Sequence, residues 1–232
     1  MNFAPFEDAN LREIESLNQR GGRTLSILDL VEAGTLDVRI AAYFVSILSE
    51  GASVLTAARP GGAGKSTLLA NLLGFLPPDV RIRPVSGMGC EPPSPRTPQQ
   101  RVCHLAHEIG TGAYYGYIWG EEVPEFFALA RRGDLIASCL HADTLDEVRD
   151  VLLGDLLVPG RDFERVNVLA FMHIEGGFLR PKRRVSAVYE RGPGGHALVF
   201  RWDPERDSFE ECTPTRLASS TSIERWRRFL EW

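Results

Sequence analysis

The feature that most constrains this chain is a segment of small residues, 59–67 (RPGGAGKST), set between two apolar runs. Residues 53–58 (SVLTAA) suit a buried strand, and residues 65–76 repeat apolar side chains at helical spacing until Pro77 and Pro78. Small residues let successive backbone N–H groups turn toward one anion, and the start of the following helix adds positive potential there. The pattern therefore predicts a strand, an anion-binding loop and a helix, which together open an α/β fold.

The second half of this segment matches the end of the nucleotide-binding pattern G-x-x-x-x-G-K-[ST]. In that pattern the lysine reaches the β- and γ-phosphates and the next hydroxyl binds Mg²⁺, which assigns these roles to Lys65 and Ser66. Only Lys65 and Lys182 are lysines among 26 basic residues, which favours a specific role for the Lys65 ammonium. The alternative is a glycine-rich turn with an incidental lysine. We expect ATP and Mg²⁺ to bind at Gly61, Gly62, Ala63, Gly64, Lys65, Ser66 and Thr67, with Ser66 as the metal ligand.

The composition is that of a folded globular chain. Of 232 residues, 44% are hydrophobic and 25% are charged, which excludes a disordered, collagen-like or coiled-coil chain. At roughly 150 residues per domain, the length allows one large domain or two small ones. The net charge of −5 argues against a dedicated nucleic-acid binder, because such proteins carry a basic excess.

Neither the first residues nor the apolar runs predict export or membrane insertion. Residues 1–15 carry several carboxylates and no apolar run, unlike a signal peptide. The longest apolar stretch, 40–48, is far shorter than the roughly 20 residues that span a bilayer. The cysteines form no C-x-x-C pair and indicate reduced thiols: Cys90, Cys103, Cys139 and Cys212. We therefore expect a cytoplasmic protein.

Apolar periodicity and turn residues divide the rest of the chain into further elements. Helices are expected within 1–25 and at 25–31, 38–48, 65–76, 124–132, 145–153 and 221–232. Strands are expected at 53–58, 80–85, 101–109, 115–119, 135–140, 166–172, 184–189 and 197–202, the last three as an antiparallel addition. The proline-rich segment 87–100 predicts a mobile loop that proteases cut first.

Three segments follow from this division: a lead-in over 1–25, an α/β domain over 26–211 and a C-terminal helix over 212–232. Capping boxes are predicted for the two last helices, formed by Thr144 with Glu147 and by Thr221 with Glu224. The terminal helix is amphipathic, and we expect its apolar face to pack on the body: Ile223, Trp226, Phe229 and Leu230.

Taken in order, several motifs are similar to those of the secretion and traffic ATPases, the motors of type II and type IV secretion and of pilus assembly. The resemblance is closest to the tight-adherence pilus type and covers most of residues 26–203. It rests on the glycine-rich region 26–82, the apolar-Gly-Glu sequence 118–121 (IWGE), the histidine-bearing 133–143 (GDLIASCLHAD), and the strand-like stretches 181–190 (PKRRVSAVYE) and 200–203 (FRWD).

The resemblance implies a RecA-like P-loop NTPase core with antiparallel C-terminal strands and a terminal helix. It implies ATP hydrolysis coupled to assembly or transport, with Lys65, Glu121 and His141 as the catalytic residues. Glu121 would position the attacking water and His141 would report the γ-phosphate to the next subunit. The family also implies a homo-oligomer, specifically a hexamer, a partner in a membrane platform or secretion machinery, and a place at the inner face of the membrane.

The chain departs from that family at several points. Only residues 1–25 precede the shared region, so we expect a short form that lacks the family's N-terminal domain. Residues 85–87 (VSG) stand where the family has carboxylates, and residues 110–116 are a shortened form of the family's arginine-bearing stretch that contains no arginine. Glu122 replaces an arginine and Arg59 replaces the first glycine of the nucleotide-binding pattern. We therefore expect slow hydrolysis that depends on Arg59 or on an arginine from another subunit.

Other residues leave alternatives open. Glu122 or Glu108 could replace Glu121 as the catalytic carboxylate. His104 and His107 lie beside Cys103, but residues three apart on a strand face opposite sides, so a metal site is not expected there. Lys182, Arg183 and Arg184 are expected to form a solvated strand face.

Three functions remain after these observations. The first is a compact ATPase of the secretion or pilus-motor type. The second is a nucleotide-binding regulatory subunit with little or no hydrolysis. The third is a nucleotide-dependent DNA-handling protein, although the sequence gives no strong nucleic-acid signal.

Overall fold

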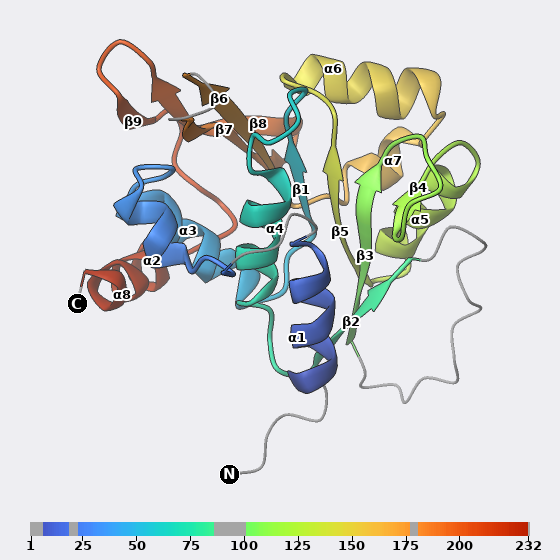
Figure 1. Ribbon diagram of the computed structural model, residues 1–232, viewed down its shortest axis with the longest axis horizontal. Coiled ribbons are helices and arrows are strands. Elements are labelled where there is room, and N and C mark those ends of the chain that lie inside the picture. The colour runs from blue at the N-terminus through green and yellow to red at the C-terminus, as the bar shows by residue number, and fades with distance from the viewer. Residues whose placement is uncertain (1–6, 19–22, 86–100, 177–180, 232) are drawn as a thin grey trace.

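The computed structural model describes residues 7–18, 23–85, 101–176 and 181–231. In this part of the chain, one mixed sheet runs through the molecule and carries helices on both faces (Figure 1). The described strands are β1 (Val54–Ala57), β2 (Val80–Pro84), β3 (Arg101–Ile109), β4 (Tyr117–Ile118), β5 (Leu135–Leu140), β6 (Val168–Glu175), β7 (Lys182–Gly192), β8 (Gly195–Asp203) and β9 (Ser208–Glu211). Their order is β2-β3-β5-β1-β6-β7-β8-β9, with β4 paired to β3. The chain is therefore a mixed α/β protein, as its sequence predicts.

Strand β1 lies in the interior of the sheet, between β5 and β6. Val54 pairs with Ala137 of β5 and with Val168 of β6, and both pairings are parallel. All of β1 is buried, which explains its uninterrupted apolar sequence. Strands β2, β3 and β5 run in the same direction, so their carboxyl ends meet at one edge. In parallel α/β sheets this is the edge at which ligands bind.

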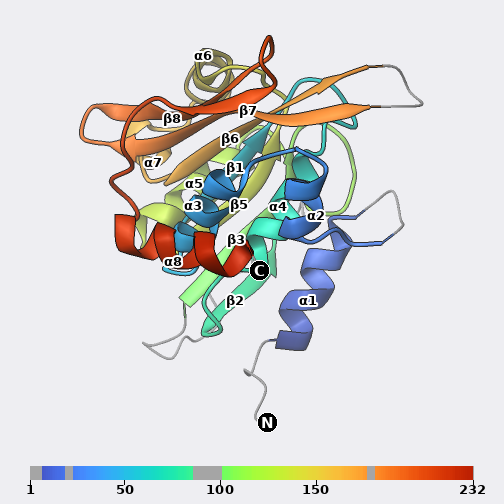
Figure 2. The ribbon, with the colours of Figure 1, turned by 90° about the vertical axis from the view of Figure 1, so that its left-hand side faces the viewer.

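The helices divide between the two faces of the sheet, each with its own apolar core. One face carries α2 (Ile27–Glu32), α3 (Val38–Leu48) and α4 (Lys65–Leu73), and α8 (Ser220–Leu230) packs against α3 (Figure 2). The other face carries α5 (Glu122–Arg131), α6 (Leu145–Arg149) and α7 (Gly160–Phe163). Helix α3 is buried from Ile40 onward, so its apolar sequence reflects burial within the core.

The helix predicted in the lead-in is α1 (Glu7–Ser16), which packs beside β2 (Figure 1). Asn10 closes the open edge of that strand. Its Nδ2 donates to the Val80 carbonyl at 2.8 Å, and its Oδ1 accepts from the Ile82 amide at 2.8 Å. The side-chain amide therefore satisfies backbone groups that an unpaired edge strand leaves exposed.

The C-terminal strands form the predicted antiparallel addition. Strand β6 pairs antiparallel with β7, β7 with β8, and β8 with β9. Strand β9 and helix α7 were not predicted, because each of these four-residue segments carries a single large apolar residue and so displays no period. The predicted strand at 115–119 shortens to the two residues of β4.

The two predicted capping boxes have different outcomes. At α6, the Thr144 hydroxyl accepts from the Glu147 amide at 3.2 Å, but the Glu147 carboxylate accepts from the Asp143 amide and leaves the box half formed. The predicted helix continues past α6 as a π-helical turn, η1 (Asp150–Asp155). At α8, the cap is Ser219, whose hydroxyl accepts from the Ser222 amide at 3.1 Å.

The box predicted for Thr221 and Glu224 is therefore wrong. Glu224 pairs with Arg227 and Arg228 along the exposed side of α8. The predicted packing face is correct for Ile223 and Leu230, which pack against the core, but Phe229 is 68% exposed.

Other sequence predictions concern single residues or segments. The predicted loop 87–100 lies outside the described residues. Cys103 and Cys139 are buried free thiols and Cys212 is an exposed one. Burial raises the pKa of Cys103 and of Cys139 to about 12. Among the described residues, no helix combines the length and the apolar character needed to cross a bilayer.

Candidate functional site

The glycine-rich loop joins the end of β1 to the start of α4, as its sequence predicts. Gly62 and Gly64 have φ of 83° and 99°, in the left-handed region that favours glycine. Gly64 is also the N-cap of α4, so the helix begins at Lys65. A Cβ on Gly64 would lie 3.3 Å from both Arg183 Cδ and Met172 Cε. The loop therefore needs glycine there for its backbone conformation and for close packing.

A cavity of about 580 Å³ opens beside this loop. Its wall contains every residue that the sequence assigns to nucleotide binding: Gly61, Gly62, Ala63, Gly64, Lys65, Ser66 and Thr67. Glu108, Tyr117 and His141 line the same cavity. The fold thus brings the loop together with the ends of two neighbouring strands, β3 and β5.

Lys65 has a nearly buried side chain at the base of the cavity. Its Nζ donates to the Ala58 carbonyl at 3.0 Å and lies 3.7 Å from Glu108 Oε1. The Lys65 carbonyl accepts from the Thr56 hydroxyl at 3.2 Å, which fixes the first turn of α4 to β1. The ammonium is therefore held at the loop before any ligand is present.

Glu108 is the carboxylate that the strand order brings to this ammonium. It lies near the end of β3, and its Oε1 is 3.2 Å from His141 Nε2. Within the described part of the chain, this buried Oε1 accepts no hydrogen bond. Burial and the Glu108 charge together raise the pKa of Tyr117. The cavity wall thus includes a buried carboxylate oxygen whose hydrogen-bonding capacity the described residues leave unused.

His141 follows β5 and connects Glu108 to the glycine-rich loop. Its Nδ1 is 2.9 Å from the Arg59 carbonyl, which can only accept, so Nδ1 carries the proton. Its Nε2 faces Glu108, and the side chain is 49% exposed. The imidazole can therefore respond to a ligand that enters the cavity.

Glu121 does not join this group. It is exposed at the N-cap of α5 and does not line the cavity, and Glu122 lies in the first turn of the same helix. The fold brings Lys65 and His141 together with Glu108, which the sequence offered only as an alternative. The sequence signal for Glu108 is a carboxylate near the end of an apolar strand. Residues 118–121 display the same signal, so it does not distinguish Glu108 from Glu121.

Arg59, at the mouth of the loop, is held by carboxylates. Its guanidinium is 2.7 Å from Glu147 Oε1, and its amide donates to Asp143 Oδ1 at 2.7 Å. The Asp143 amide and the Arg59 side chain both lower the pKa of Glu147. Arg59 therefore anchors the loop to the start of α6, with its charge already paired.

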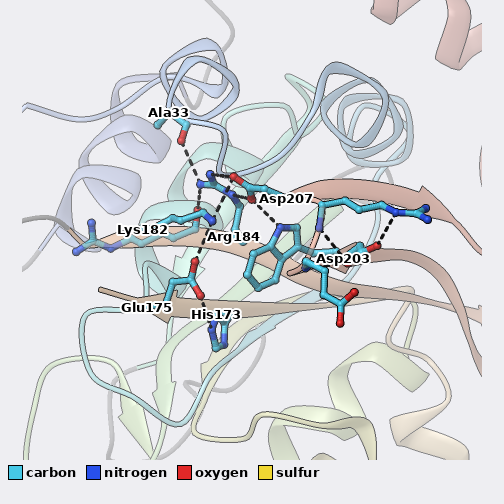
Figure 3. Close-up of polar contacts among 11 residues, drawn as sticks. Ala33, His173, Glu175, Lys182, Arg184, Asp203 and Asp207 are labelled. Carbon is cyan, nitrogen blue, oxygen red and sulfur yellow. Dashed lines mark hydrogen bonds and ion pairs between the residues drawn. The ribbon is translucent and has the colours of Figure 1, made fainter. Parts of the chain in front are cut away.

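The prediction of a solvated face at residues 182–184 is wrong for Arg184, which is buried and whose polar contacts Figure 3 shows. Its Nε and Nη2 donate to the two carboxylate oxygens of Asp207 at 2.8 and 2.9 Å. This fork lowers the pKa of Asp207. Lys182 Nζ lies 2.9 Å from Glu175 and 3.2 Å from Asp207. These charges join the end of the β6–β7 hairpin to the turn between β8 and β9.

The two histidines of β3 contact different elements. His104 Nε2 is 3.1 Å from Asp134, just before β5, and His107 Nε2 is 3.2 Å from the Ser16 hydroxyl at the end of α1. Burial lowers the pKa of His107. Both therefore hold neighbouring elements against β3.

Comparisons with known proteins find similarity among solved structures but not in sequence. No protein-family model matches the chain, and no curated protein matches it in sequence. Among solved structures, the chain is similar to the VirB11 ATPase from the Brucella suis type IV secretion system in complex with sulphate, at 18% identity and a TM-score of 0.43. The match covers 82% of this chain and 64% of that one, so this chain spans less than two thirds of its length. This similarity is too distant to assign a function.

Proposed function

We propose that this chain is a P-loop ATPase of the secretion and pilus-motor type, which binds Mg-ATP in the cavity beside the glycine-rich loop. The observation that carries the proposal is the convergence of Lys65, Glu108 and His141 on that cavity. A cation next to a glycine-rich loop at the start of a helix, with a carboxylate facing it, suits phosphoryl transfer to water.

The order of the parallel strands supports a RecA-like core. Strand β1 ends in the loop, β5 lies beside it and ends at His141, and β3 follows with Glu108. Because these strands are parallel and adjacent, their carboxyl ends can present all three groups to one ligand.

The phosphates would bind the loop amides and the Lys65 ammonium. Lys65 is now satisfied by the Ala58 carbonyl and by Glu108, so a triphosphate would replace at least one of these contacts. Mg²⁺ prefers oxygen ligands and keeps several waters. The Ser66 hydroxyl, on the first turn of α4, and the Glu108 carboxylate are oxygen donors in the cavity wall, so the residues fit the ion. We assign Ser66 Oγ as its protein ligand, and the bound ion would neutralise phosphate charge.

Glu108 would orient and deprotonate the attacking water. The water oxygen bonds to the γ-phosphorus while the bond from that phosphorus to the β–γ bridging oxygen breaks, and the electron pair leaves with ADP. The water proton passes to the Glu108 carboxylate, whose Oε1 accepts no hydrogen bond from the described residues. We propose this role for Glu108 in place of Glu121, which does not line the cavity.

His141 would sense the state of the nucleotide. Its imidazole contacts both the loop, through the Arg59 carbonyl, and Glu108. A γ-phosphate that draws Glu108 or the loop away would change both contacts. The coupled machinery, a hexamer acting with a secretion or pilus-assembly partner, is proposed from the sequence resemblance alone.

A DNA-handling role is not favoured, because Lys182 and Arg184 are already paired with carboxylates. The proposed function is tested by calorimetry with Mg-ATP and Mg-ADP and by phosphate release, for wild type and for Lys65→Ala. We expect wild type to bind both nucleotides and to release phosphate, and Lys65→Ala to lose affinity and turnover. Absence of binding at millimolar nucleotide would exclude the proposal. Binding with no turnover would favour the regulatory subunit.

A further inference from the structure

We propose that Arg183 is the cation that binds the terminal phosphates of the nucleotide, supplied by the same chain that carries the glycine-rich loop. The proposal rests on the proposed function, because it concerns the same cavity. It replaces the expectation that this charge must come from Arg59 or from a neighbouring subunit.

The side chain of Arg183, on β7, contacts the glycine-rich loop. Its Nε donates to the Gly62 carbonyl at 2.8 Å, and its Cδ is the atom that a Cβ on Gly64 would approach to 3.3 Å. The side chain lines the cavity together with Ser66 and Thr67. A strand from the C-terminal part of the chain thus places a guanidinium beside the residues that would hold the phosphates.

The described residues do not neutralise the charge of Arg183. The two neighbouring cations on β7 are neutralised, because Lys182 pairs with Glu175 and Arg184 pairs with Asp207. Among the described residues, no carboxylate pairs with Arg183, and its Nη groups make no hydrogen bond, although Nε is bound to a carbonyl. Arg59 differs, because Glu147 already occupies its guanidinium. Arg183 is therefore a cation at the cavity wall that can accept an anionic partner.

The backbone at Arg183 is held in place by the next residue. Arg184 Nη1 donates to the Arg183 carbonyl at 2.8 Å and to the Ala33 carbonyl at 3.3 Å, while Asp207 holds the rest of its guanidinium (Figure 3). Asp207 also accepts from Trp202 Nε1 at 2.9 Å. This network joins β7, the β8–β9 turn and the end of α2, so the point from which Arg183 extends is fixed before the nucleotide binds.

The chemistry of a guanidinium suits this position. Its planar fork donates two parallel hydrogen bonds to phosphate oxygens, which an ammonium cannot reproduce. In phosphoryl transfer, an arginine supplied within the same chain or by a neighbour stabilises charge on the transferred group. The fork of Arg183 can do so while Nε keeps the loop carbonyl.

The test compares full-length wild type with Arg183→Gln, Arg183→Lys and the control Arg191→Gln, a change on the same strand outside the cavity wall. Turnover is measured by phosphate release, affinity for Mg-ATP and Mg-ADP by calorimetry, and folding by thermal unfolding without nucleotide. We expect Arg183→Gln to lower kcat by roughly 10³-fold and to weaken ATP binding more than ADP binding. Arg183→Lys should recover only part of both, and Arg191→Gln should match wild type.

A mixing experiment separates the two sources of the arginine. Arg183→Gln chains keep the loop and Lys65→Ala chains keep the arginine, so a mixture regains activity only if Arg183 acts on a neighbour's nucleotide. We expect no recovery. Recovery, or an Arg183→Gln variant with the kcat and ATP-to-ADP preference of wild type, would overturn the proposal. If Arg183→Gln does not fold, Arg183→Lys carries the same comparison. Failure of wild type to bind nucleotide would instead reject the proposed function.

Discussion

The Lys65 ammonium lies 3.7 Å from the Glu108 carboxylate and joins the first residue of α4 to the end of β3. Their side chains are only 8% and 11% exposed, so the two charges interact in a poorly hydrated place. Removing one partner of such a pair leaves the other buried without compensation. A nucleotide and its metal would therefore compete with an existing contact at each end of this pair.

The first prediction is that these two residues are energetically coupled in the absence of nucleotide. Lys65→Met and Glu108→Gln should each lower the free energy of unfolding, and the double variant should lose less than the sum, with a coupling of roughly 0.5–3 kcal/mol. Urea unfolding of the four proteins measures this. The more exposed pair Arg206 and Asp203, with side chains 76% and 21% exposed, serves as the control and should show nearly additive changes. Additive losses at Lys65 and Glu108 would contradict the prediction.

The second prediction assigns the catalytic carboxylate. Glu108→Gln should lower turnover by roughly 10²–10⁴-fold, because a general base is lost. ATP affinity should be kept or improved, since a negative charge leaves the cavity. Glu121→Gln is the matched control and should retain wild-type turnover, as this residue is exposed and away from the cavity. If the two results are reversed, Glu121 has the role that the sequence suggested.

The third prediction concerns His141. His141→Ala should reduce kcat by roughly 10²-fold while KM for ATP changes little, because the imidazole contacts the loop and Glu108 and holds no phosphate in our proposal. Steady-state phosphate release gives both constants. His173→Ala, a half-exposed histidine outside the cavity wall, is the control. A rise in KM alone would show that His141 serves substrate binding instead.

The fourth prediction is a decline of stability in mild acid. Burial lowers the pKa of His196 below its ordinary value of 6.5, while its Nε2 donates to the Val166 carbonyl at 2.8 Å. Below pH 6.5 the unfolded chain therefore binds a proton that the folded chain does not, and the free energy of unfolding falls as the pH falls. His196→Gln keeps a donor but cannot titrate, so its stability should fall less between pH 7 and pH 5.5 in urea unfolding.

His107 contributes to the same decline, since burial also lowers its pKa. The variant His196→Gln should therefore flatten the dependence without removing it. The control is Thr221→Ala, an exposed change that involves no titrating group, which should leave the slope of wild type unchanged. A slope in His196→Gln equal to that of wild type would show that His196 is not responsible.

Much of the fold follows from local sequence. The strands at 101–109 and 135–140 agree with their predicted bounds, because turn residues end their apolar runs. The π-helical turn η1 could not be predicted, since residues 145–153 repeat apolar side chains at the spacing of an ordinary α-helix. The α8 cap was misplaced because Ser219 and Thr221 are both residues that favour an N-cap, and the helix begins after the first of them.

The candidate site, like the fold, has one part that local sequence predicts and one part that it does not. The glycine-rich loop could be identified because its binding groups are contiguous in sequence. The choice between Glu108 and Glu121 depends on strand order, since both follow short apolar runs and only one lies beside the cavity. Likewise, Arg184 is buried because Asp207 reaches it from the turn between β8 and β9. Neither contact has a local signature.

The interior position of β1 has a consequence for how the chain is made. Its two neighbours are β5 and β6, which are synthesised long after it. Such distant pairings slow folding, and a ribosome adds roughly 5–20 residues per second. For several seconds the nascent chain therefore exposes the apolar segment of β1 and the glycine-rich loop, before the other strands that complete the cavity are made. The ATP site that we propose is therefore absent from the chain during this interval.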